Sequence, residues 1–291
     1  MLDGGRRGET TVQRSAVPAP PLRYAGTACL AAVHAASLPA VAALLPSDRL
    51  RPVRWTGGRG LLSIVAFRYG AVASADDPPR WLTPYGEVSV GVVVTRGPAP
   101  PVLPVLRPLS LFVLHLPVTT AEARDAGRQL WGFPKFVADV AFTEGPRVRR
   151  AELSEGGRRV LTLAGRGRGP VLTDRRSAVM YSELDGQLVE TVVPMSGQLR
   201  LGRGARAGRL ELGDHPVADE LRGLGVDPVP LAIFDYLTHS SVLPAGRPVG
   251  PARPWPGHAG DATAGRCTVR WPGLPPLDLA PVPQPAAAGD R

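Results

Sequence analysis

A row of valines at every second position is the feature that most constrains the fold of this chain. The row lies in the segment 85–95 and consists of Val88, Val90, Val92 and Val94. Successive side chains of a strand point to opposite faces, so the valines form one face and Tyr85 and Glu87 belong to the other. Such a strand suits a closed or strongly curved sheet that is packed outside and hollow inside. We therefore expect Glu87 to point into a cavity.

The rest of the chain predicts more strands than helices. Its 34 glycines and 33 prolines make up almost a quarter of the 291 residues, which favours short elements joined by turns. Apolar alternation predicts strands over 30–34, 60–69, 109–116, 136–142, 171–183, 186–194, 210–212 and 237–243, and a hairpin over 148–163. Helices are expected over 38–45, from a capping box at Thr119 and Glu122 to about 130, and over 216–224 with Asp214 as its cap. This pattern is typical of an α+β domain.

The chain divides into three parts by composition. We expect a flexible N-terminal arm over residues 1–18, a single domain over 19–250, and a Pro/Gly/Ala-rich C-terminal extension over 251–291. No window is apolar enough for a membrane span and the first residues carry no signal core, which predicts a cytoplasmic protein. The two cysteines, Cys29 and Cys267, exclude a disulfide scaffold.

A net charge of +9 and a pI of about 10.6 raise the question of nucleic-acid binding. The arginines are scattered along the chain and interleaved with acidic residues, without a recognition-helix or stacking-aromatic pattern. The Arg-Gly runs at 165–169 and 202–206 are interpreted as solvated turns. We therefore expect no nucleic-acid partner.

The chain has a single lysine, Lys135, among 34 basic residues. Arginine replaces lysine at almost any surface position, but its guanidinium stays charged and cannot attack a carbonyl. A lysine amine can lose its proton when it is buried. Lys135 is therefore a candidate amine nucleophile, and the alternatives are chance survival or a buried ammonium paired with a carboxylate.

The surroundings of Lys135 in the sequence fit this chemistry. An amine nucleophile needs an apolar site that favours the neutral amine, a group that moves protons, and a cavity for the carbonyl substrate. Trp131, Phe133 and Phe136 would supply the apolar surroundings. Glu87, with Tyr85 beside it, would supply the acid/base group on a neighbouring strand.

These residues resemble a known family. The segment GRQLWGFPK, from Gly127 to Lys135, resembles the Gly-Arg-Glu-x-x-x-(Tyr/Phe)-Pro-Lys segment of the acetoacetate decarboxylase family, whose lysine forms a Schiff base with the substrate ketone. Tyr85-Gly86-Glu87 is similar to the family's Tyr-x-Glu, and the stretch 212–219 is similar to the start of its late helix. The order and spacing agree over most of the chain. The resemblance implies a cone-like antiparallel β-barrel with flanking helices, and a homo-oligomer.

Three departures from the family pattern bear on the substrate. Phe136 stands where acetoacetate decarboxylase has a second lysine, so burial alone would activate Lys135. A second acidic residue of the family falls at Ser63. The family's substrate-binding arginine falls near Thr27, which leaves Arg23 or Arg128 as its substitutes and weakens the case for a small carboxylate substrate.

The sequence leaves three functions open. The first is a Schiff-base lyase that acts on a ketone, β-keto acid or 2-oxo acid by decarboxylation or by aldol addition and dehydration, with Lys135 and Glu87 as catalytic residues. The second is a non-covalent cyclase of a polyketide-like intermediate, and the third is a ligand-binding protein without turnover. Each implies a small-molecule partner and no cofactor, and the five histidines show no metal-ligand spacing. The substrate-binding candidates are Tyr85, Arg128, Trp131, Phe133, Phe136 and Arg23.

Overall fold

A computed structural model describes residues 17–97, 109–260 and 267–269. Its helices are α1 (Leu38–Leu44), α2 (Ala121–Trp131) and α3 (Pro216–Gly223), with a short 3-10 turn over Thr56–Gly58. The strands in the first half are β1 (Leu22–Ser37), β2 (Leu50–Pro52), β3 (Arg59–Tyr69), β4 (Ala71–Ala73), β5 (Trp81–Leu82), β6 (Tyr85–Arg96) and β7 (Leu109–His115). The later strands are β8 (Asp139–Glu144), β9 (Arg149–Glu155), β10 (Arg158–Gly165), β11 (Arg168–Asp174), β12 (Ser177–Leu184), β13 (Gln187–Gly202), β14 (Gly208–Leu212), β15 (Ala232–Leu243), β16 (Arg247–Pro251) and β17 (Cys267–Val269).

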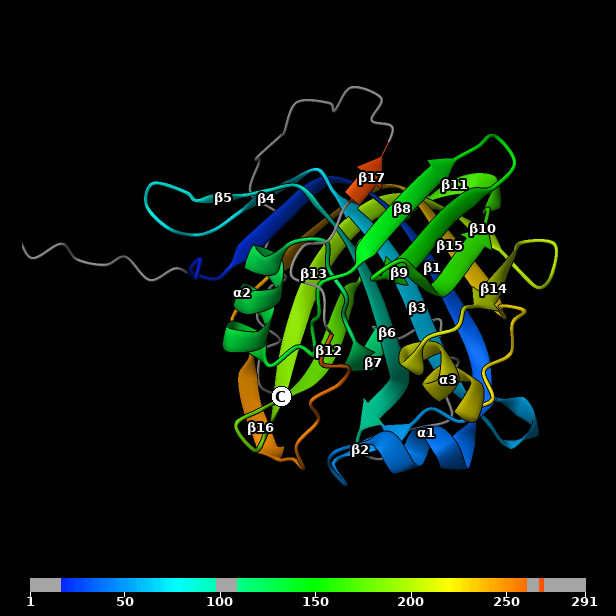
Figure 1. Cartoon of the computed structure of the whole chain (residues 1–291), viewed down its shortest axis with the longest axis horizontal. Helices are drawn as coiled ribbons and strands as arrows, with labels where there is room; N and C mark the ends of the chain where they lie inside the picture. Colours follow the sequence, from blue (N-terminus) through cyan, green and yellow to red (C-terminus); the bar gives the residue numbers. More distant parts are fainter. Residues whose placement is uncertain (1–16, 98–108, 261–266, 270–291) are drawn as a thin grey trace, which may run out of the picture.

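The large sheet closes on itself. Its hydrogen-bonded order β13-β12-β7-β6-β3-β1 is completed by β15, which pairs with both β1 and β13. A second sheet of order β14-β10-β9-β8-β17 covers one side of this ring, and α2 lies against the outside of the ring (Figure 1). The expected α+β fold with a barrel-like curved sheet is therefore confirmed. Two pairs depart from the antiparallel expectation, because β7 and β12 run parallel in the large sheet and β8 and β17 run parallel in the second sheet.

The two faces of β6 behave as the valine row predicts. Val88, Val90, Val92 and Val94 are buried in the main core, which includes residues of the covering sheet. Glu87 and Ser89 point the other way and line a cavity inside the ring. Burial of the valines between two sheets holds β6 in the register that directs Glu87 inward.

Helix α2 begins one residue later than expected. Thr120 is its N-cap, and the Thr120 hydroxyl accepts the N–H of Ala123 at 3.3 Å. The hydroxyl of Thr119 instead accepts the N–H of Gly86 at 3.0 Å, which ties the start of α2 to β6. Gly132 ends the helix in the left-handed conformation with φ of 64°, which glycine adopts without strain.

Two other sequence expectations are corrected by the structure. His215 caps α3 instead of Asp214, because its Nδ1 accepts the N–H of Val217. The strand expected over 136–142 begins only at Asp139, since the residues before it bridge to Val118 and pass across the end of β6. Among the described residues, no helix has both the length and the apolar character needed to cross a bilayer.

Candidate active site

The ring of strands encloses an apolar cavity of about 110 Å³. Its polar lining residues are Glu87, Ser89, Lys135, His239, Ser241 and three tyrosines, Tyr24, Tyr69 and Tyr236. The remaining wall is aliphatic, aromatic or sulfur-containing: Cys29, Ala31, Val65, Phe67, Leu109, Leu111, Leu116, Phe133, Ala178, Met180, Val193, Met195 and Leu243. An apolar cavity with a few convergent polar groups is the usual form of a small-molecule site.

Lys135 and Glu87 form a buried ion pair in this cavity. Lys135 Nζ lies 2.7 Å from Glu87 Oε2, and the two residues are 4% and 6% exposed. A buried charge without a partner costs several kcal/mol, so each of these groups depends on the other. Transfer of one proton along this hydrogen bond would leave a neutral amine and a neutral acid in an apolar site.

Helix α2 and the loop after it hold Lys135 in place. The loop is bonded by its backbone on both sides, since Phe133 N–H donates to Gly127 O, and Leu116 and Val118 N–H donate to Pro134 O and Phe136 O. The lysine stem crosses α2 at Gly127, where an added Cβ would lie 2.5 Å from its Cδ and Cε. Gly127 therefore provides the space through which Lys135 reaches Glu87.

Three tyrosines surround the other side of the carboxylate. The hydroxyl of Tyr69 donates to Glu87 Oε1 at 3.1 Å, and the Tyr69 ring packs on Tyr24 and Tyr85 at 4.6 and 5.0 Å between centroids. Burial, with the nearby charge of Glu87, raises the pKa of Tyr24 and Tyr69 above the usual value for a phenol. These hydroxyls therefore remain protonated at neutral pH, and the Tyr69 hydroxyl keeps the proton that it donates to Glu87.

His239 is a cavity residue that was not among the site residues predicted from the sequence. It is 3% exposed and packs against Phe67 and Tyr236. Burial lowers the pKa of His239 to about 4, so its imidazole is neutral at pH 7. It can hydrogen-bond a substrate without adding charge to the cavity.

The structure brings together only part of the predicted site. Phe133 lines the cavity with Lys135 and Glu87. The ring of Tyr85 lies 5.8 Å from Lys135 Nζ, behind the cavity wall formed by Tyr24 and Tyr69. The other four candidates lie outside the cavity lining: Trp131, Phe136, Arg128 and Arg23.

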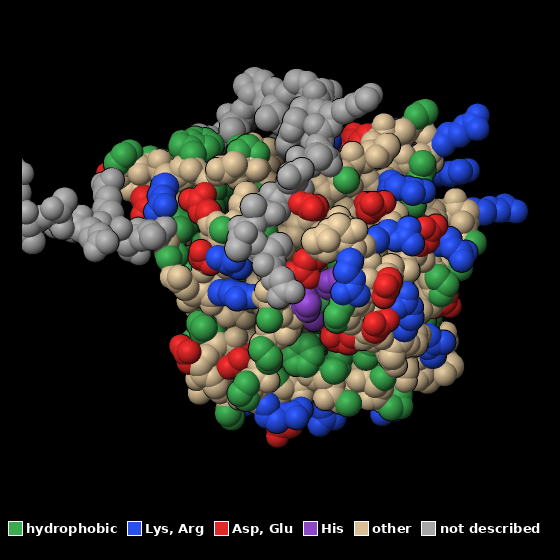
Figure 2. All heavy atoms as spheres, viewed as in Figure 1, with side chains coloured by type: hydrophobic (Ala, Val, Ile, Leu, Met, Phe, Trp, Pro, Cys, Tyr) green, Lys and Arg blue, Asp and Glu red, His purple; other side chains and the backbone are tan. Residues whose placement is uncertain are grey.

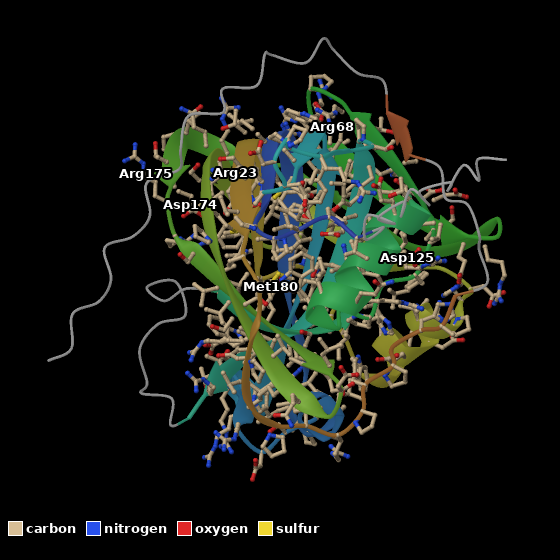
Figure 3. All side chains as sticks on the ribbon, turned by 90° about the vertical axis from the view of Figure 1, so that its left-hand side faces the viewer. Arg23, Arg68, Asp125, Asp174, Arg175 and Met180 are labelled. Carbon is tan, nitrogen blue, oxygen red and sulfur yellow. The ribbon has the colours of Figure 1, made fainter. Side chains whose placement is uncertain are left out.

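Each of these four has a different environment. Trp131 donates its indole N–H to Pro244 O at 2.7 Å, and Phe136 is buried in the main core. Arg128 Nε donates to the carbonyl oxygen of Lys135 at 2.5 Å, so it supports the lysine loop through the backbone. Arg23 is exposed, toward one end of the ring, whereas Met180 lies near its middle (Figure 3).

A cluster outside the cavity has the residue types of a metal site. Glu155, His215 and His258 offer ligand atoms within 4.8 Å of one another. His215 Nδ1 accepts the N–H of Val217, so the proton of this imidazole is on Nε2, which faces Glu155 Oε2 at 2.7 Å. A metal needs a lone pair at that nitrogen. The cluster is therefore arranged as a hydrogen-bonded network.

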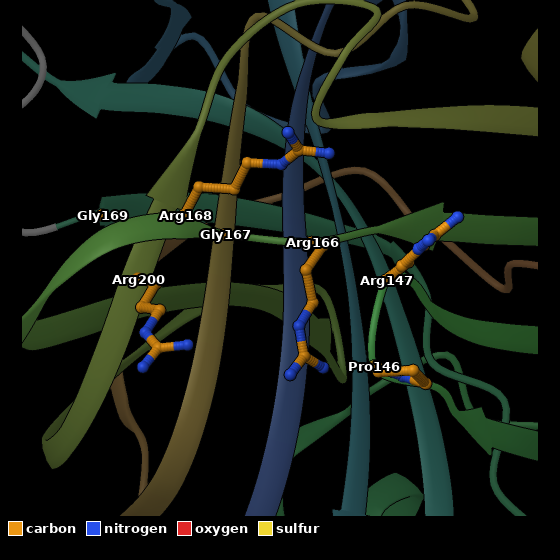
Figure 4. Close-up of a pocket in the computed structure, with 7 residues that line it drawn as sticks. All are labelled: Pro146, Arg147, Arg166, Gly167, Arg168, Gly169 and Arg200. Carbon is orange, nitrogen blue, oxygen red and sulfur yellow. The ribbon is translucent and has the colours of Figure 1, made fainter.

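A second groove lies between the two sheets, away from the lysine cavity. It measures about 490 Å³ and is lined by Pro146, Arg147, Arg166, Gly167, Arg168, Gly169 and Arg200 (Figure 4). Arg166 pairs with the buried Asp235 at 3.4 Å. This lining holds neither a nucleophile nor a carboxylate, and Figure 2 shows basic and acidic side chains mixed over the neighbouring face. The lysine cavity is thus the stronger catalytic candidate.

Known proteins resemble this chain in both sequence pattern and fold. No curated protein matches it significantly, but a family model described as acetoacetate decarboxylase matches residues 9–238. Among solved structures, the enduracididine biosynthesis enzyme MppR with HEPES buffer bound is 16% identical with a TM-score of 0.60, over 86% of this chain and 98% of that chain. Acetoacetate decarboxylase from Legionella pneumophila is 16% identical with a TM-score of 0.60, over 86% of this chain and 99% of the other. An acetoacetate decarboxylase-like enzyme from Sphingomonas wittichii RW1 is 14% identical with a TM-score of 0.58, over 84% of this chain and all of the other.

At these identities the solved structures establish the likeness of fold, and the family model adds a sequence match over most of the chain. The matched region includes β6 with Glu87 and the loop with Lys135. The chain therefore belongs to the acetoacetate decarboxylase family.

Proposed function

We propose that this protein is a Schiff-base lyase in which Lys135 attacks a carbonyl substrate and Glu87 moves the protons. The observation that carries the proposal is the contact of 2.7 Å between the chain's single lysine and a buried carboxylate inside a largely apolar cavity. Membership of the acetoacetate decarboxylase family supports an enzyme of this general type.

The covalent step uses only the amine, the carboxylate and the substrate. Glu87 accepts one proton from the Lys135 ammonium, and the neutral Nζ adds to the carbonyl carbon to give a carbinolamine. The carboxylic acid returns a proton to the departing hydroxyl, and loss of water leaves an iminium whose positive charge lies next to the Glu87 carboxylate. The iminium then accepts the electron pair released when a bond to the adjacent carbon breaks.

The reaction after imine formation is decarboxylation or aldol addition with dehydration. A solved structure of MppR is described as complexed with the condensation product of pyruvate and imidazole 4-carboxaldehyde, and it is 16% identical to this chain with a TM-score of 0.57. That likeness makes aldol-type condensation as reasonable a candidate here as decarboxylation. Either reaction requires the same lysine and the same proton carrier.

The cavity volume indicates how much of a substrate can lie beside Lys135. The cavity measures about 110 Å³ and is partly open to solvent. The reacting part of the substrate is therefore small, and a larger body would have to extend through the open side of the cavity.

Borohydride trapping tests the proposal directly. The protein is incubated at pH 7 with a panel of small ketones and 2-oxo acids, reduced with sodium borohydride, and digested for mass spectrometry. Reduction of the imine should add the substrate's carbon skeleton to the peptide that contains Lys135. Because Lys135 is the only lysine, the α-amino group is the one competing primary amine.

Lys135→Arg is the matched control for this experiment. Arginine keeps the positive charge beside Glu87 but cannot form an imine. The variant should give no adduct while its melting curve still shows a cooperative transition. Absence of any adduct on the wild-type lysine across the whole panel, or turnover by a folded Lys135→Arg variant, would reject covalent catalysis.

A further inference from the structure

The charge inside the cavity indicates the class of substrate. Lys135 carries the only positive charge among the described residues of the lining, and Glu87 already balances it. Among the described residues, Arg149 and Arg176 contact Tyr236 of the cavity wall, but each is paired with a buried aspartate, Asp235 and Asp174. Arg128 binds backbone carbonyls and Arg23 is exposed, so none of these guanidinium groups lines the cavity. A substrate carboxylate would therefore enter an apolar cavity next to Glu87 without a partner of its own.

The remaining polar groups of the cavity are uncharged. His239, Ser89 and Ser241 can each exchange hydrogen bonds with an oxygen, whereas the Tyr236 hydroxyl donates to Asp174 Oδ2 at 2.6 Å and the Tyr69 hydroxyl donates to Glu87. Apart from Tyr24, the rest of the wall is aliphatic, aromatic or sulfur-containing. Resting on the proposed Schiff-base function, we infer that the substrate is a small, uncharged carbonyl compound with an apolar body, such as a short aliphatic ketone or aldehyde. This class excludes pyruvate, which one of the similar structures contains, and every other keto acid, so of the two reactions proposed above it leaves aldol addition with dehydration.

Two probes of similar size, 2-pentanone and pyruvate, test this inference. Each is trapped on Lys135 with borohydride, and its yield is divided by its yield on N-acetyl-lysine at the same pH, which removes the difference in intrinsic reactivity. Normalised trapping should favour 2-pentanone by at least about tenfold. A tenfold ratio corresponds to about 1.4 kcal/mol, and burying a carboxylate without a partner costs more free energy than that. A normalised ratio near one, or one that favours pyruvate, overturns the inference.

A variant with an added cation in the cavity should shift the trapping preference toward pyruvate. Met180 is half-buried in the cavity wall, so Met180→Arg should place a guanidinium there and raise normalised trapping of pyruvate, whereas Met180→Leu should leave the ratio unchanged.

Calorimetric titration of Lys135→Met separates the hypothesis of covalent catalysis from the hypothesis of an uncharged substrate. If the wild type forms no adduct but this variant binds 2-pentanone better than pyruvate, the covalent function fails and the substrate class stands. Equal or reversed binding would reject the substrate class.

A separate observation concerns residues 251–260, which lie beyond the region matched by the family model. This segment, here called the strap, crosses the outside of the loop that carries Lys135. Arg128 joins the two, since its Nε donates to Lys135 O and its guanidinium donates to Ala259 O at 3.2 Å. The ring of His258 lies 4.7 Å from the ring of Phe136 in an edge-on arrangement.

Two glycines allow the strap to approach the loop closely. Gly257 and Gly260 have φ of +62° and +75°, which other residues adopt only with strain. A Cβ at Gly257 would lie 2.5 Å from Pro134 Cβ, and a Cβ at Gly260 would lie 2.6 Å from Phe136 Cβ. The strap backbone therefore packs directly on both residues that flank Lys135.

The strap is also attached to elements that do not belong to the loop. His258 Nε2 lies 2.7 Å from Glu155 Oε2, and the indole N–H of Trp255 donates to Leu114 O at 3.0 Å. At its other end, the Arg253 guanidinium donates to Leu45 O, and the backbone N–H of Arg253 donates to Pro46 O, so this end stays attached when the guanidinium is removed. The loop is thus held between α2 on one side and the strap on the other.

We propose that the strap positions Lys135, with His258 and Gly260 as positioning residues. It restricts the loop from the outside, so that Nζ stays aligned with Glu87. The expected effect of the strap on activity rests on the proposed function, whereas its expected effect on the loop is independent of that function.

The test compares His258→Gln and Gly260→Ala with Arg253→Ala, which alters the strap far from Lys135. The rate of imine trapping with 2-pentanone or, if that fails, with the best probe of the panel is measured as a function of probe concentration. Both positioning variants should lower the maximal rate at least about tenfold, since a misplacement of about 1 Å can cost a hundredfold, with little change in the half-saturating concentration. Arg253→Ala should match the wild type.

Hydrogen exchange gives a readout that does not need activity. The amides of Leu116 and Val118 donate to the carbonyls of Pro134 and Phe136, so they should exchange faster in His258→Gln and Gly260→Ala and at the wild-type rate in Arg253→Ala. A wild type that forms no adduct would reject the proposed function and leave exchange to decide on the strap. Unchanged exchange at these amides, or unchanged maximal rates where adducts form, would reject the positioning role.

Discussion

Gly127→Ala separates the stability of α2 from the position of Lys135. In an exposed helix interior, alanine is more favourable than glycine by about 1 kcal/mol. At Gly127 the new methyl group would lie 2.5 Å from Lys135 Cδ and Cε, whereas nonbonded carbons prefer about 3.5–4.0 Å. The atoms that must move belong to the flexible end of the lysine, so the side chain shifts by about 1 Å and the helix backbone does not.

Gly127→Ala should affect the stability of the fold much less than the position of Lys135. Overpacking costs about 1–3 kcal/mol, which the gain in helix propensity partly offsets, so the free energy of unfolding should fall by no more than about 2 kcal/mol. A shift of Nζ by about 1 Å lengthens its 2.7 Å hydrogen bond to Glu87 Oε2 beyond hydrogen-bond range. Misplacement of this size costs a reaction about a hundredfold. Imine trapping should therefore fall about a hundredfold in a protein that remains folded.

Gly223→Ala is the matched control. Gly223 is the last residue of α3, and an added Cβ there would meet nothing within 4 Å. This variant should be at least as stable as the wild type and should trap ketones at the wild-type rate. Urea denaturation and borohydride trapping are measured for all three proteins. Normal trapping by Gly127→Ala, or a loss of trapping accompanied by general unfolding, would refute the argument that this glycine makes room for the lysine.

Three further predictions concern the cavity. Lys135→Met should lower the free energy of unfolding, measured in urea, by about 3–5 kcal/mol, because it leaves the Glu87 carboxylate buried without a cation. Adding Glu87→Gln to this variant should recover much of the loss. If the losses of the two single variants instead add up in the double variant, the buried ion pair is contradicted. Glu87→Gln alone should reduce turnover by about a hundredfold in steady-state assays with the substrate found by trapping, and unchanged turnover would exclude Glu87 as the proton carrier. The folded-state pKa of His239, about 4, lies below its unfolded value, so protons bind the unfolded chain preferentially and stability should fall as the pH drops from about 6.5 toward 4. His239→Gln should lose less stability than the wild type between pH 7 and pH 5, measured by urea denaturation.

The inner face of the fold could be predicted from the sequence because strand alternation is a local rule. The valine row fixed which side of β6 is buried between sheets, and Glu87 then had to point into the ring. The side chain of Phe136 was harder to place, and the structure shows it in the main core. Phe136 was nevertheless included among the substrate-binding candidates on the basis of its proximity in sequence, which does not determine the face.

Other features could not be predicted because they depend on distant partners. Thr119 and Thr120 are equally suited to cap α2, and the choice between them is made by the N–H of Gly86, which occupies the Thr119 hydroxyl. His258 and Glu155 lie 103 positions apart, so no spacing rule brings them together. The predicted cytoplasmic location, the homo-oligomer and the three-part division of the chain remain predictions.

The arginines of this chain explain why its one lysine is chemically distinct. Arg128 is only seven positions from Lys135, yet it donates to the carbonyl oxygens of Lys135 and Ala259, and no guanidinium belongs to the described lining of the cavity. Since the charge of Lys135 is balanced by Glu87 alone, one proton transferred between them neutralises both groups. An arginine in the cavity would leave a fixed positive charge that no proton transfer removes. With the arginine placed against the backbone, Lys135 and Glu87 are the only oppositely charged pair in the described lining of the cavity.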